Sequence, residues 1–279
     1  MPSVLVTGAS TGIGRATALR LDAAGWKVFA GVRREADAES LAAEASDRLA
    51  PVMLDVTDAA QIAAAAERIG AEVGDAGLDG LVNNAGIGVP GPLETIPMED
   101  FRRQVEVNMI GHVAVTKAML PALRRAPGRI VFISSIGGRI AFPLNGSYHV
   151  AKFGIEAAGD VFRQELRTSG ISVSIVEPGS IKTPIWERSD REIEALLERA
   201  PETERLYGKQ VAGIRRASRK LGERGIPPER VAARIEHALT ARRPRTRYLV
   251  GIDAKVQARA KVLTPARIWD RIVARMIGF

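Results

Sequence analysis

Short apolar runs alternate with longer helical segments through the first 180 residues, and this alternation constrains the fold more than any other feature of the chain. The apolar runs lie at residues 3–7, 27–32, 50–54, 78–83, 129–134 and 172–177. Segments of helical character separate them, such as the Ala-rich stretch 58–73 and the stretch 98–123. Nearly continuous apolar strands spaced by helices are typical of a parallel sheet covered on both faces. The pattern therefore predicts an α/β fold with a doubly wound parallel sheet.

One domain is expected over residues 1–254, because neither a repeat nor a Pro/Ser-rich linker interrupts the first 180 residues. A charged helical segment, 187–221, then breaks the alternation and is closed by Gly225-Ile226-Pro227-Pro228. A helix at 228–241 and a strand at 247–250 return to the fold. Ligands bind at the carboxyl edge of such a sheet, where this insertion follows the sixth strand. Residues of about 184–228 are therefore predicted to form a helical lid over the substrate.

The amino-acid composition excludes several kinds of functional site. The chain has no cysteine, which excludes a disulfide framework, a thiolate metal site and a cysteine nucleophile. A reducing cytoplasm is the expected setting, because the first apolar run is too short for a signal peptide and no later stretch is long enough to cross a bilayer. The three histidines, His112, His149 and His237, show no metal-ligand spacing, so no metal is expected.

The net charge of +8 belongs to the last third of the chain. Residues 1–187 carry 18 Lys and Arg against 21 Asp and Glu, whereas residues 188–279 carry 22 against 11. A basic last third would suit a nucleic-acid module. The segment lacks a helix-turn-helix and a basic pattern interleaved with aromatic residues, so no nucleic-acid partner is expected.

A glycine-rich turn follows the first strand directly, with the sequence Thr7-Gly8-Ala9-Ser10-Thr11-Gly12-Ile13-Gly14. Glycines at the mouth of a helix let the backbone turn tightly and approach a pyrophosphate, whose charge is met by free helix N–H groups. A glycine-rich turn without a ligand is the alternative, and the position at the first strand–helix junction disfavours it. The turn therefore predicts a dinucleotide site.

Six motifs in a fixed order resemble those of the short-chain dehydrogenase/reductase family in its single-domain form. They are the glycine-rich turn, Asn83-Asn84-Ala85-Gly86, Asn108, Ser135, Tyr148 with Lys152, and Pro178-Gly179 with Thr183. The resemblance spans roughly residues 3 to 250 and implies a Rossmann-type sheet and NAD(P)-dependent oxidoreductase activity. Segments 134–139 and 175–179 look like the retinol and 17β-hydroxysteroid dehydrogenase branch. That branch implies a lipophilic substrate of steroid, retinoid or fatty type.

Tyr148 and Lys152 lie four residues apart in a helical segment, so their side chains share a face. An adjacent ammonium favours the phenolate and is expected to lower the pKa of Tyr148 from its usual value near 10. The resemblance makes both residues catalytic, together with Ser135, which orients the substrate oxygen, and Asn108, which supports a water in a proton relay.

Two neighbours of these residues are alternatives. Ser134 matches the family's serine-to-tyrosine spacing less well than the serine that follows it. His149 directly follows the tyrosine, and successive helical positions point about 100° apart, so His149 is not expected to be catalytic.

The resemblance also implies a cofactor site at the carboxyl ends of the strands. Its expected residues are Gly8, Ser10, Thr11, Gly12, Ile13, Gly14, Arg33, Asp55, Val56, Asn83, Ala85, Gly86, Tyr148, Lys152, Pro178, Gly179, Ile181 and Thr183. Asp55 resembles the family's adenine contact, although an aspartate there could also cap a helix. The segment 178–183 resembles the one that meets the nicotinamide carboxamide through its backbone and the Thr183 hydroxyl.

Arg33-Arg34 follows the second strand, where an NAD enzyme usually presents an acidic side chain to the ribose 2′-hydroxyl. A guanidinium suits a 2′-phosphate instead and can stack on adenine. NADP(H) is therefore the expected cofactor, with Arg33 as the principal contact. A solvated arginine pair in an enzyme that uses NAD is the alternative.

Two features predict contacts beyond the substrate. Segments 98–123 and 148–168 carry more apolar residues than one sheet face needs, and the family commonly dimerises through these helices, so a homodimer or homotetramer is expected. Residues 255–279 are predicted to form a basic amphipathic C-terminal helix, typical of peripheral contact with an anionic membrane. Its apolar positions are Ile268, Trp269, Ile272, Val273, Met276 and Ile277, beside Arg267, Arg271 and Arg275. The same apolar face could cap the substrate cleft or a neighbouring subunit.

The expected activity is hydride transfer between NADP(H) and a lipophilic alcohol/carbonyl pair. A regulatory protein that senses a dinucleotide without turnover is the alternative. Retention of Ser135, Tyr148 and Lys152 favours an enzyme, because a sensor does not need all three.

Overall fold

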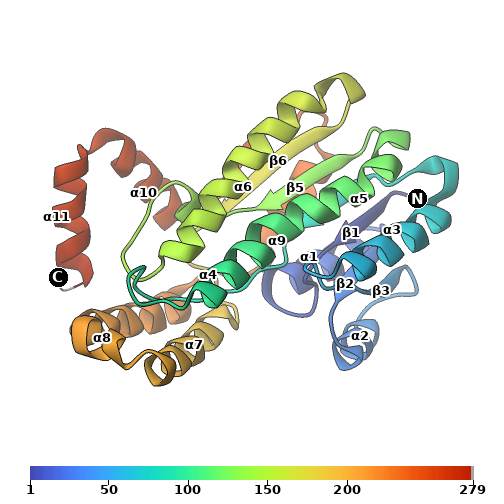
Figure 1. Cartoon of the computed structure of the whole chain (residues 1–279). Helices are drawn as coiled ribbons and strands as arrows, with labels where there is room; N and C mark the ends of the chain where they lie inside the picture. The colour runs from blue at the N-terminus through green and yellow to red at the C-terminus, as the bar shows by residue number, and fades with distance from the viewer. Residues whose placement is uncertain (278–279) are drawn as a thin grey trace.

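Seven parallel strands form one sheet in a computed structural model that describes residues 1–277, with side chains through Arg275 (Figure 1). The strand order is β3-β2-β1-β4-β5-β6-β7. The strands are β1 (Ser3–Val6), β2 (Lys27–Val32), β3 (Leu49–Met53), β4 (Gly80–Asn83), β5 (Arg129–Ile133), β6 (Ser172–Pro178) and β7 (Arg247–Val250). The predicted doubly wound α/β fold is confirmed. The order reverses between β1 and β4, and in such sheets ligands bind in the crevice outside that point.

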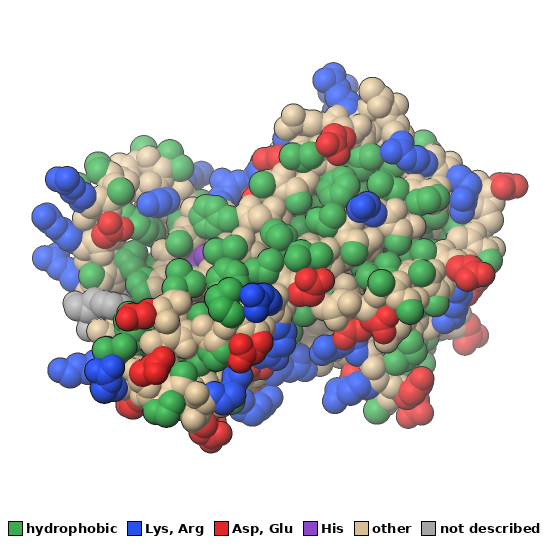
Figure 2. All heavy atoms as spheres, in the orientation of Figure 1, with side chains coloured by type: hydrophobic (Ala, Val, Ile, Leu, Met, Phe, Trp, Pro, Cys, Tyr) green, Lys and Arg blue, Asp and Glu red, His purple; other side chains and the backbone are tan. Residues whose placement is uncertain are grey.

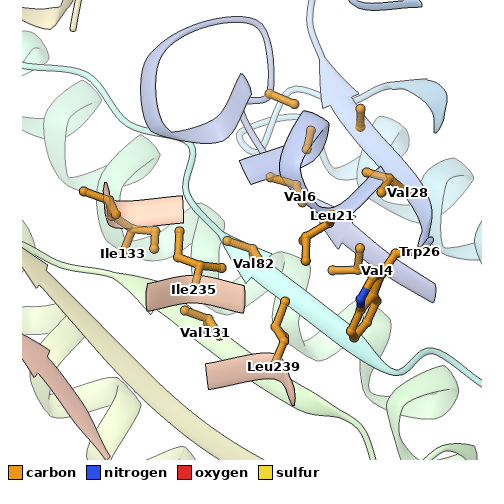
Figure 3. Close-up of a cluster of buried hydrophobic side chains, with 14 of the residues drawn as sticks. Val4, Val6, Leu21, Trp26, Val28, Val82, Val131, Ile133, Ile235 and Leu239 are labelled. Atoms are coloured by element: carbon orange, nitrogen blue, oxygen red, sulfur yellow. The ribbon is translucent and has the colours of Figure 1, made fainter. Parts of the chain in front are cut away.

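Helices cover both faces of the sheet because alternate side chains of each strand point to opposite faces. On one face, α1 (Gly12–Ala23), α2 (Glu35–Ala42) and α9 (Glu229–Thr240) pack on a buried cluster drawn in Figure 3. That cluster joins Val4, Val28 and Val131 of the strands to Leu21 of α1 and to Ile235 and Leu239 of α9.

The opposite face is covered by α3 (Ala59–Val73), α5 (Gly111–Arg125) and α6 (Gly146–Glu165). Leu5, Phe29 and Phe132 of the strands pack there against Ile69, Met119 and Ile155 of these helices. A buried side chain of this size contributes about 1.5–3 kcal/mol to folding. The two clusters therefore fix the sheet and, with it, the positions of the strand ends.

The predicted helical segment 98–123 contains α4 (Met98–Val105), a π-helical turn (Glu106–Ile110) and α5. A single continuous segment over 187–221 was the expectation for the lid, but the structure has two helices, α7 (Ile185–Arg199) and α8 (Pro201–Arg224). Pro201 starts the second helix because proline fits the first turn of a helix and cannot continue a preceding one. Arg215 of α8 contacts Asp190 of α7 through two nitrogens, which ties the two lid helices together.

The C-terminal segment forms two helices, α10 (Ile252–Leu263) and α11 (Ala266–Ile277), which Thr264 and Pro265 separate. Trp269 and Val273 are buried against Ile140, so α11 packs on the enzyme itself. Figure 1 shows α11 beside the lid helix α8. The apolar positions Met276 and Ile277 of the predicted helix lie outside the described side chains, and residues 278 and 279 lie outside the described chain. Within the part of the chain that the structure describes, no helix is long and apolar enough to span a membrane.

Candidate active site

The glycine-rich turn packs directly on the end of β4. Gly8 has φ +64°, and a Cβ there would lie 2.8 Å from Cα of Ala85. A Cβ at Gly14 would lie 2.2 Å from the Gly8 carbonyl oxygen. Both positions therefore require glycine, and the backbone of the turn lies open at the start of α1.

The start of α1 is suited to an anion. Thr11 is the N-cap residue, its side chain makes no capping hydrogen bond, and the first turn holds no acidic residue. The first N–H groups of a helix have no partner within the helix, and they bind phosphates readily. Ser10 lies in the turn beside Thr11, whereas Ile13 packs partly against the core. The expected pyrophosphate site fits this geometry.

Asn84, which the sequence analysis did not select, holds the glycine-rich turn in place. Its Nδ2 donates to the carbonyl oxygens of Thr7 and Gly8 at 3.0 and 3.1 Å. The backbone N–H groups of Asn84 and Ala85 donate to the Thr7 hydroxyl at 2.9 and 3.0 Å. These four hydrogen bonds join the ends of β1 and β4, where the crevice for a dinucleotide begins.

The expected contact Asn83 instead points into the protein. Its side chain is fully buried and donates to the Thr116 hydroxyl at 2.8 Å. His112, also fully buried, places Nε2 2.6 Å from the Ala85 carbonyl oxygen. Burial, followed by the charge of Lys152, lowers the pKa of His112 to about 3. The imidazole is therefore neutral, and its Nε2–H donates to Ala85 and supports the strand end.

Arg33 lies at the end of β2, where its Nη1 is 3.7 Å from Oδ2 of Asp55. The Arg33 side chain is 62% exposed and therefore free to turn toward a ligand. Arg34 points elsewhere, because its Nε and Nη2 both contact the Asp37 carboxylate at 2.7 Å. The structure thus separates the two arginines and places only Arg33 beside the expected adenine contact.

The segment after β6 lies over the start of α1. The Thr183 methyl group is 3.0 Å from the position that a Cβ on Gly12 would occupy. Gly179, which follows Pro178 at the end of the strand, donates its N–H to the Val250 carbonyl oxygen at 2.9 Å. The side chains of Val56 and Ile181 are buried, and the Ile181 carbonyl oxygen accepts a hydrogen bond from Trp186 Nε1 at 2.7 Å.

Asn108 occupies the π-helical turn between α4 and α5. Its fully buried amide makes two hydrogen bonds with the backbone of Ile87, Oδ1 accepting from N–H and Nδ2 donating to the carbonyl, both at 2.9 Å. A Cβ on Gly86 would lie 3.5 Å from the same Oδ1. Single π-turns occur frequently at functional sites, and this one turns Asn108 toward the loop after β4.

Ser135, Tyr148 and Lys152 come together at the ends of β5 and α6. Ser135 lies close enough to Tyr148 to act on the pKa of its hydroxyl, and Ser135 Oγ accepts from the Gly137 N–H at 3.0 Å. Lys152 Nζ lies 5.8 Å from the centre of the Tyr148 ring and donates to the Ile133 carbonyl oxygen at 2.8 Å. The tyrosine and lysine therefore share a helix face, and the serine meets the tyrosine from the neighbouring strand.

Burial dominates the ionisation of both helical residues. It lowers the pKa of Lys152 to about 8, and the charge of Glu156 acts in the opposite direction. Burial also raises the pKa of Tyr148, whereas the hydrogen bond with Ser135 lowers it. The spacing of Tyr148 and Lys152 predicted a lowered pKa for the tyrosine. The pKa of Tyr148 is raised instead, because burial disfavours the phenolate.

The two neighbouring alternatives take other places. Ser134 is buried, and its hydroxyl has no hydrogen-bond partner among the described residues. His149 places Nδ1 2.8 Å from the Gly137 carbonyl oxygen, and its Nε2 accepts from the Phe142 N–H at 3.0 Å. Both imidazole nitrogens therefore support the loop that follows β5.

A cavity of about 510 Å³ lies between the lid and the segment after β6. Its lining includes Asn145, Thr183, Trp186, Ile193, Ile214 and Arg215. Asn145 is three residues before Tyr148 along the chain, and Thr183 lies over the glycine-rich turn. The cavity therefore borders Thr183 and the start of α6, which Asn145 precedes.

Comparison with known proteins agrees with this geometry. A family profile described as short chain dehydrogenase matches residues 2–194. The chain is 40% identical over 277 residues to mouse (Mus musculus) retinol dehydrogenase 5, covering 97% of this chain and 87% of the relative. It is 41% identical over 285 residues to human (Homo sapiens) 17-beta-hydroxysteroid dehydrogenase type 6, covering 98% of this chain and 87% of that protein.

Solved structures are similar over nearly the whole chain. A short-chain dehydrogenase from Streptomyces avermitilis has a TM-score of 0.78 at 29% identity, covering 97% of this chain and 96% of the other. A short-chain dehydrogenase from Burkholderia cenocepacia J2315, solved in complex with NADP, has a TM-score of 0.74 at 25% identity, covering 99% and 97%. The chain therefore belongs to the short-chain dehydrogenase family and is an NAD(P)-dependent oxidoreductase.

Proposed function

We propose that this enzyme interconverts a lipophilic alcohol and its carbonyl compound with NADP(H), and that Ser135, Tyr148, Lys152 and Asn108 perform the catalysis. The observation that carries the proposal is the grouping of Ser135, Tyr148 and Lys152 at the ends of β5 and α6, with Lys152 Nζ 5.8 Å from the centre of the Tyr148 ring. This group lies at the carboxyl edge of the sheet, as does the glycine-rich turn.

Each residue has a distinct task in the reductive direction. A bound nicotinamide would supply the hydride that reaches the carbonyl carbon. Tyr148 gives its hydroxyl proton to the carbonyl oxygen, while Ser135 holds that oxygen by a hydrogen bond. Lys152 binds the ribose and, when charged, favours the phenolate that Tyr148 becomes. Asn108 supports the water that returns a proton through Lys152, and oxidation reverses these steps.

The cofactor would lie along the strand ends. Its pyrophosphate is expected at the start of α1, near Gly12, and its nicotinamide beside Thr183. Arg33 is expected to contact the 2′-phosphate of NADP(H), because its side chain is exposed and borders Asp55. The relative solved with NADP supports this choice, and NAD remains the alternative cofactor.

The proposed substrate is of steroid, retinoid or fatty type. The names of the two relatives, a retinol dehydrogenase and a 17-beta-hydroxysteroid dehydrogenase, support that class. The 510 Å³ cavity is within the usual range for small-molecule sites, and Trp186, Ile193 and Ile214 give it apolar walls. A lipophilic molecule can therefore enter beside Thr183.

A screen of lipophilic alcohols with NADP⁺ and of lipophilic ketones and aldehydes with NADPH, read by nicotinamide absorbance, tests the proposal. We expect turnover of at least one member of the class and none with short polar alcohols. Binding of NADPH without turnover of any compound would instead favour the dinucleotide sensor.

The assembly proposed is a homodimer or homotetramer formed through α4, α5 and α6. Figure 2 shows hydrophobic side chains gathered on the face that these helices form. Ile110 in the turn before α5 and Val150, Phe153 and Val161 of α6 are each more than 40% exposed there. A second copy of the chain would cover these side chains.

The location proposed is cytoplasmic, with peripheral contact at an anionic membrane through the C-terminal segment. Lys and Arg side chains gather over α11 at the left edge of Figure 2. Ile268 and Ile272 of this helix are 49% and 42% exposed, beside Arg267 and Arg271. An exposed apolar stripe flanked by arginines suits a lipid surface.

The proposed organisation of the chain is a domain at 1–254, with its lid at about 184–228, and a C-terminal segment at 255–279.

A further inference from the structure

A buried carboxylate on β6 contacts two guanidinium groups. Glu177 on β6 is fully buried. Two nitrogens of Arg139 contact the Glu177 carboxylate: Nη2 donates a hydrogen bond to Oε1 at 2.8 Å, and Nε lies 2.7 Å from Oε2 as an ion-pair contact without hydrogen-bond alignment. Arg247 on β7 adds a third contact, Nε at 3.2 Å from Oε1. None of these three residues takes part in the proposed catalysis.

Arg139 links two segments of the proposed site. It follows the 3-10 turn Ile136–Gly138, which Ser135 begins. Its partner Glu177 directly precedes Pro178 and Gly179, where the cofactor segment starts. The ion pair therefore joins the turn that follows β5, residues 135–139 (the serine turn), to the end of β6.

Arg247 extends the network to the catalytic helix. Its Nε lies 3.1 Å from Oε2 of Glu156, and its Nη2 lies 2.7 Å from Oδ2 of Asp160. Glu156 is one helical turn after Lys152 on α6. The same network therefore reaches the three segments that carry the serine, the lysine and the cofactor contact.

The serine turn also packs on α6, and it has backbone hydrogen bonds of its own, from the Gly138 N–H to Ser135 and from the Arg139 N–H to Ile136. The strand ladder with β6 ends close by, where the Ser134 N–H donates to the Val176 carbonyl oxygen at 2.8 Å. Beyond that point, His149 holds the Gly137 carbonyl and Ser135 Oγ holds the Gly137 N–H. A guanidinium–carboxylate hydrogen bond is charge-assisted and directional, and removing Arg139 would leave the buried Glu177 carboxylate with Arg247 as its remaining cationic partner.

We propose that Arg139 is a positioning residue for the reaction, which holds the Ser135 hydroxyl against the substrate oxygen through its two-point contact with Glu177. This inference rests on the proposed function, because that function assigns the substrate oxygen to Ser135. Arg139 itself touches neither substrate nor cofactor in this account.

Three variants isolate the contact. Arg139→Met removes the guanidinium and keeps the apolar stem, whereas Arg139→Lys keeps the charge but cannot form the two-point contact. Arg48→Met is the matched control, because Arg48 contacts Asp22, which is only 8% exposed, at the opposite end of α1 from the glycine-rich turn. A purely structural loss should affect the control and the test variant alike.

Amide hydrogen exchange over residues 134–142 is the first readout, and it needs no substrate. The N–H groups of Gly137 and Gly138 donate to Ser135, so their exchange reports how firmly the turn is held. We expect exchange about tenfold faster in Arg139→Met, an intermediate rate in Arg139→Lys and no change in Arg48→Met. An unchanged rate in folded Arg139→Met overturns the proposal, even if no substrate has been found.

Turnover is the second readout, with a substrate from the screen and NADPH deuterated at the transferred position. We expect kcat to fall about tenfold in Arg139→Met, the isotope effect on kcat to rise and KM for NADPH to stay within about threefold. Arg139→Lys should recover part of kcat. A wild-type kcat, or a loss confined to KM for NADPH, overturns the proposal.

If Arg139→Met does not fold, Glu177→Gln replaces it, because this substitution keeps the shape and volume of the side chain. Both readouts are then measured on Glu177→Gln, and wild-type values overturn the proposal.

Discussion

Arg33 and Arg34 are neighbours in the chain, but their surroundings give them different parts in cofactor choice. Arg34 forms an ion pair with Asp37, whereas Arg33 lies beside Asp55 with most of its side chain exposed. We expect Arg33→Asp to lower kcat/KM for NADPH about tenfold or more and to shift preference toward NADH. Arg34→Asp changes the net charge equally and should shift the preference far less. Wild-type efficiencies that favour NADH over NADPH would refute the cofactor assignment.

Lys152 gives a pH dependence whose sign follows from its burial. Its pKa is about 8 in the folded protein, below the ordinary value of 10.5. Below pH 8 both the folded and the unfolded chain hold the proton, and the folded chain bears the cost of a buried charge. Between pH 8 and 10.5 the unfolded chain binds more protons, so this group makes stability rise with pH.

We therefore expect Lys152→Met to increase the free energy of unfolding at pH 7 by about 1–3 kcal/mol. The difference from wild type should shrink as pH rises from 8 toward 10.5. Denaturant unfolding of the apoprotein at several pH values measures it. A constant difference across this range would show that the ammonium is not desolvated.

Sequence patterns predicted which single residues carry the chemistry better than they predicted which residues contact one another. Tyr148 and Lys152 share a helix face because helical spacing dictates it, so their proximity could be predicted. Asn83 and Asn84 look equivalent in the sequence. Because side chains alternate along a strand, the first enters the core and the second reaches the glycine-rich turn. The pairing of Arg139 with Glu177 joins the turn after β5 to β6, and no local pattern encodes it.

At the level of elements, α11 has two apolar sides with different uses. Trp269 and Val273 face Ile140 and are buried, whereas Ile268 and Ile272 are exposed. We expect Trp269→Ala to lower the free energy of unfolding by about 3 kcal/mol, because it opens a cavity beside Ile140. Ile272→Glu should leave stability within about 0.5 kcal/mol of wild type.

Ile272→Glu and a truncated chain separate packing from membrane contact. We expect Ile272→Glu, and a chain lacking residues 263–279, to lose sedimentation with vesicles that contain phosphatidylserine. The Ile272→Glu variant should keep its activity on a soluble substrate. If the full-length enzyme never sediments with these vesicles at low salt, the membrane proposal is wrong and α11 serves only the enzyme's own packing.

Element types could be predicted where hydrophobic periodicity was strong. Each expected strand is present because its apolar run is buried between two helical layers. The break at Pro201 was missed because the charged, helix-favouring sequence continues on both sides of it. The short helix α2 lies where a helical segment was expected between the second and third apolar runs, but its bounds could not be predicted. It buries only Ala38 and Leu41, which is too little for a periodic signal.

At the scale of the whole molecule, the apolar face of α6 predicts self-association. Val150, Phe153 and Val161 lie on its outer side. We expect light scattering at micromolar concentration to show a dimer or tetramer, and Phe153→Glu to shift it toward monomer because a carboxylate cannot be buried unpaired. Arg167→Glu, after the end of α6, is the matched control and should leave the assembly unchanged. A wild-type monomer at that concentration would contradict the proposal.

The central claim is that Tyr148 transfers the proton in an NADP(H)-dependent reaction, and Tyr148→Phe tests it most directly. The substitution keeps the ring volume and removes only the hydroxyl. We expect kcat on the best substrate to fall about 100-fold or more, while the NADPH dissociation constant, measured by fluorescence, stays within about threefold of wild type. A variant that binds NADPH normally and keeps a tenth of wild-type turnover would contradict the account.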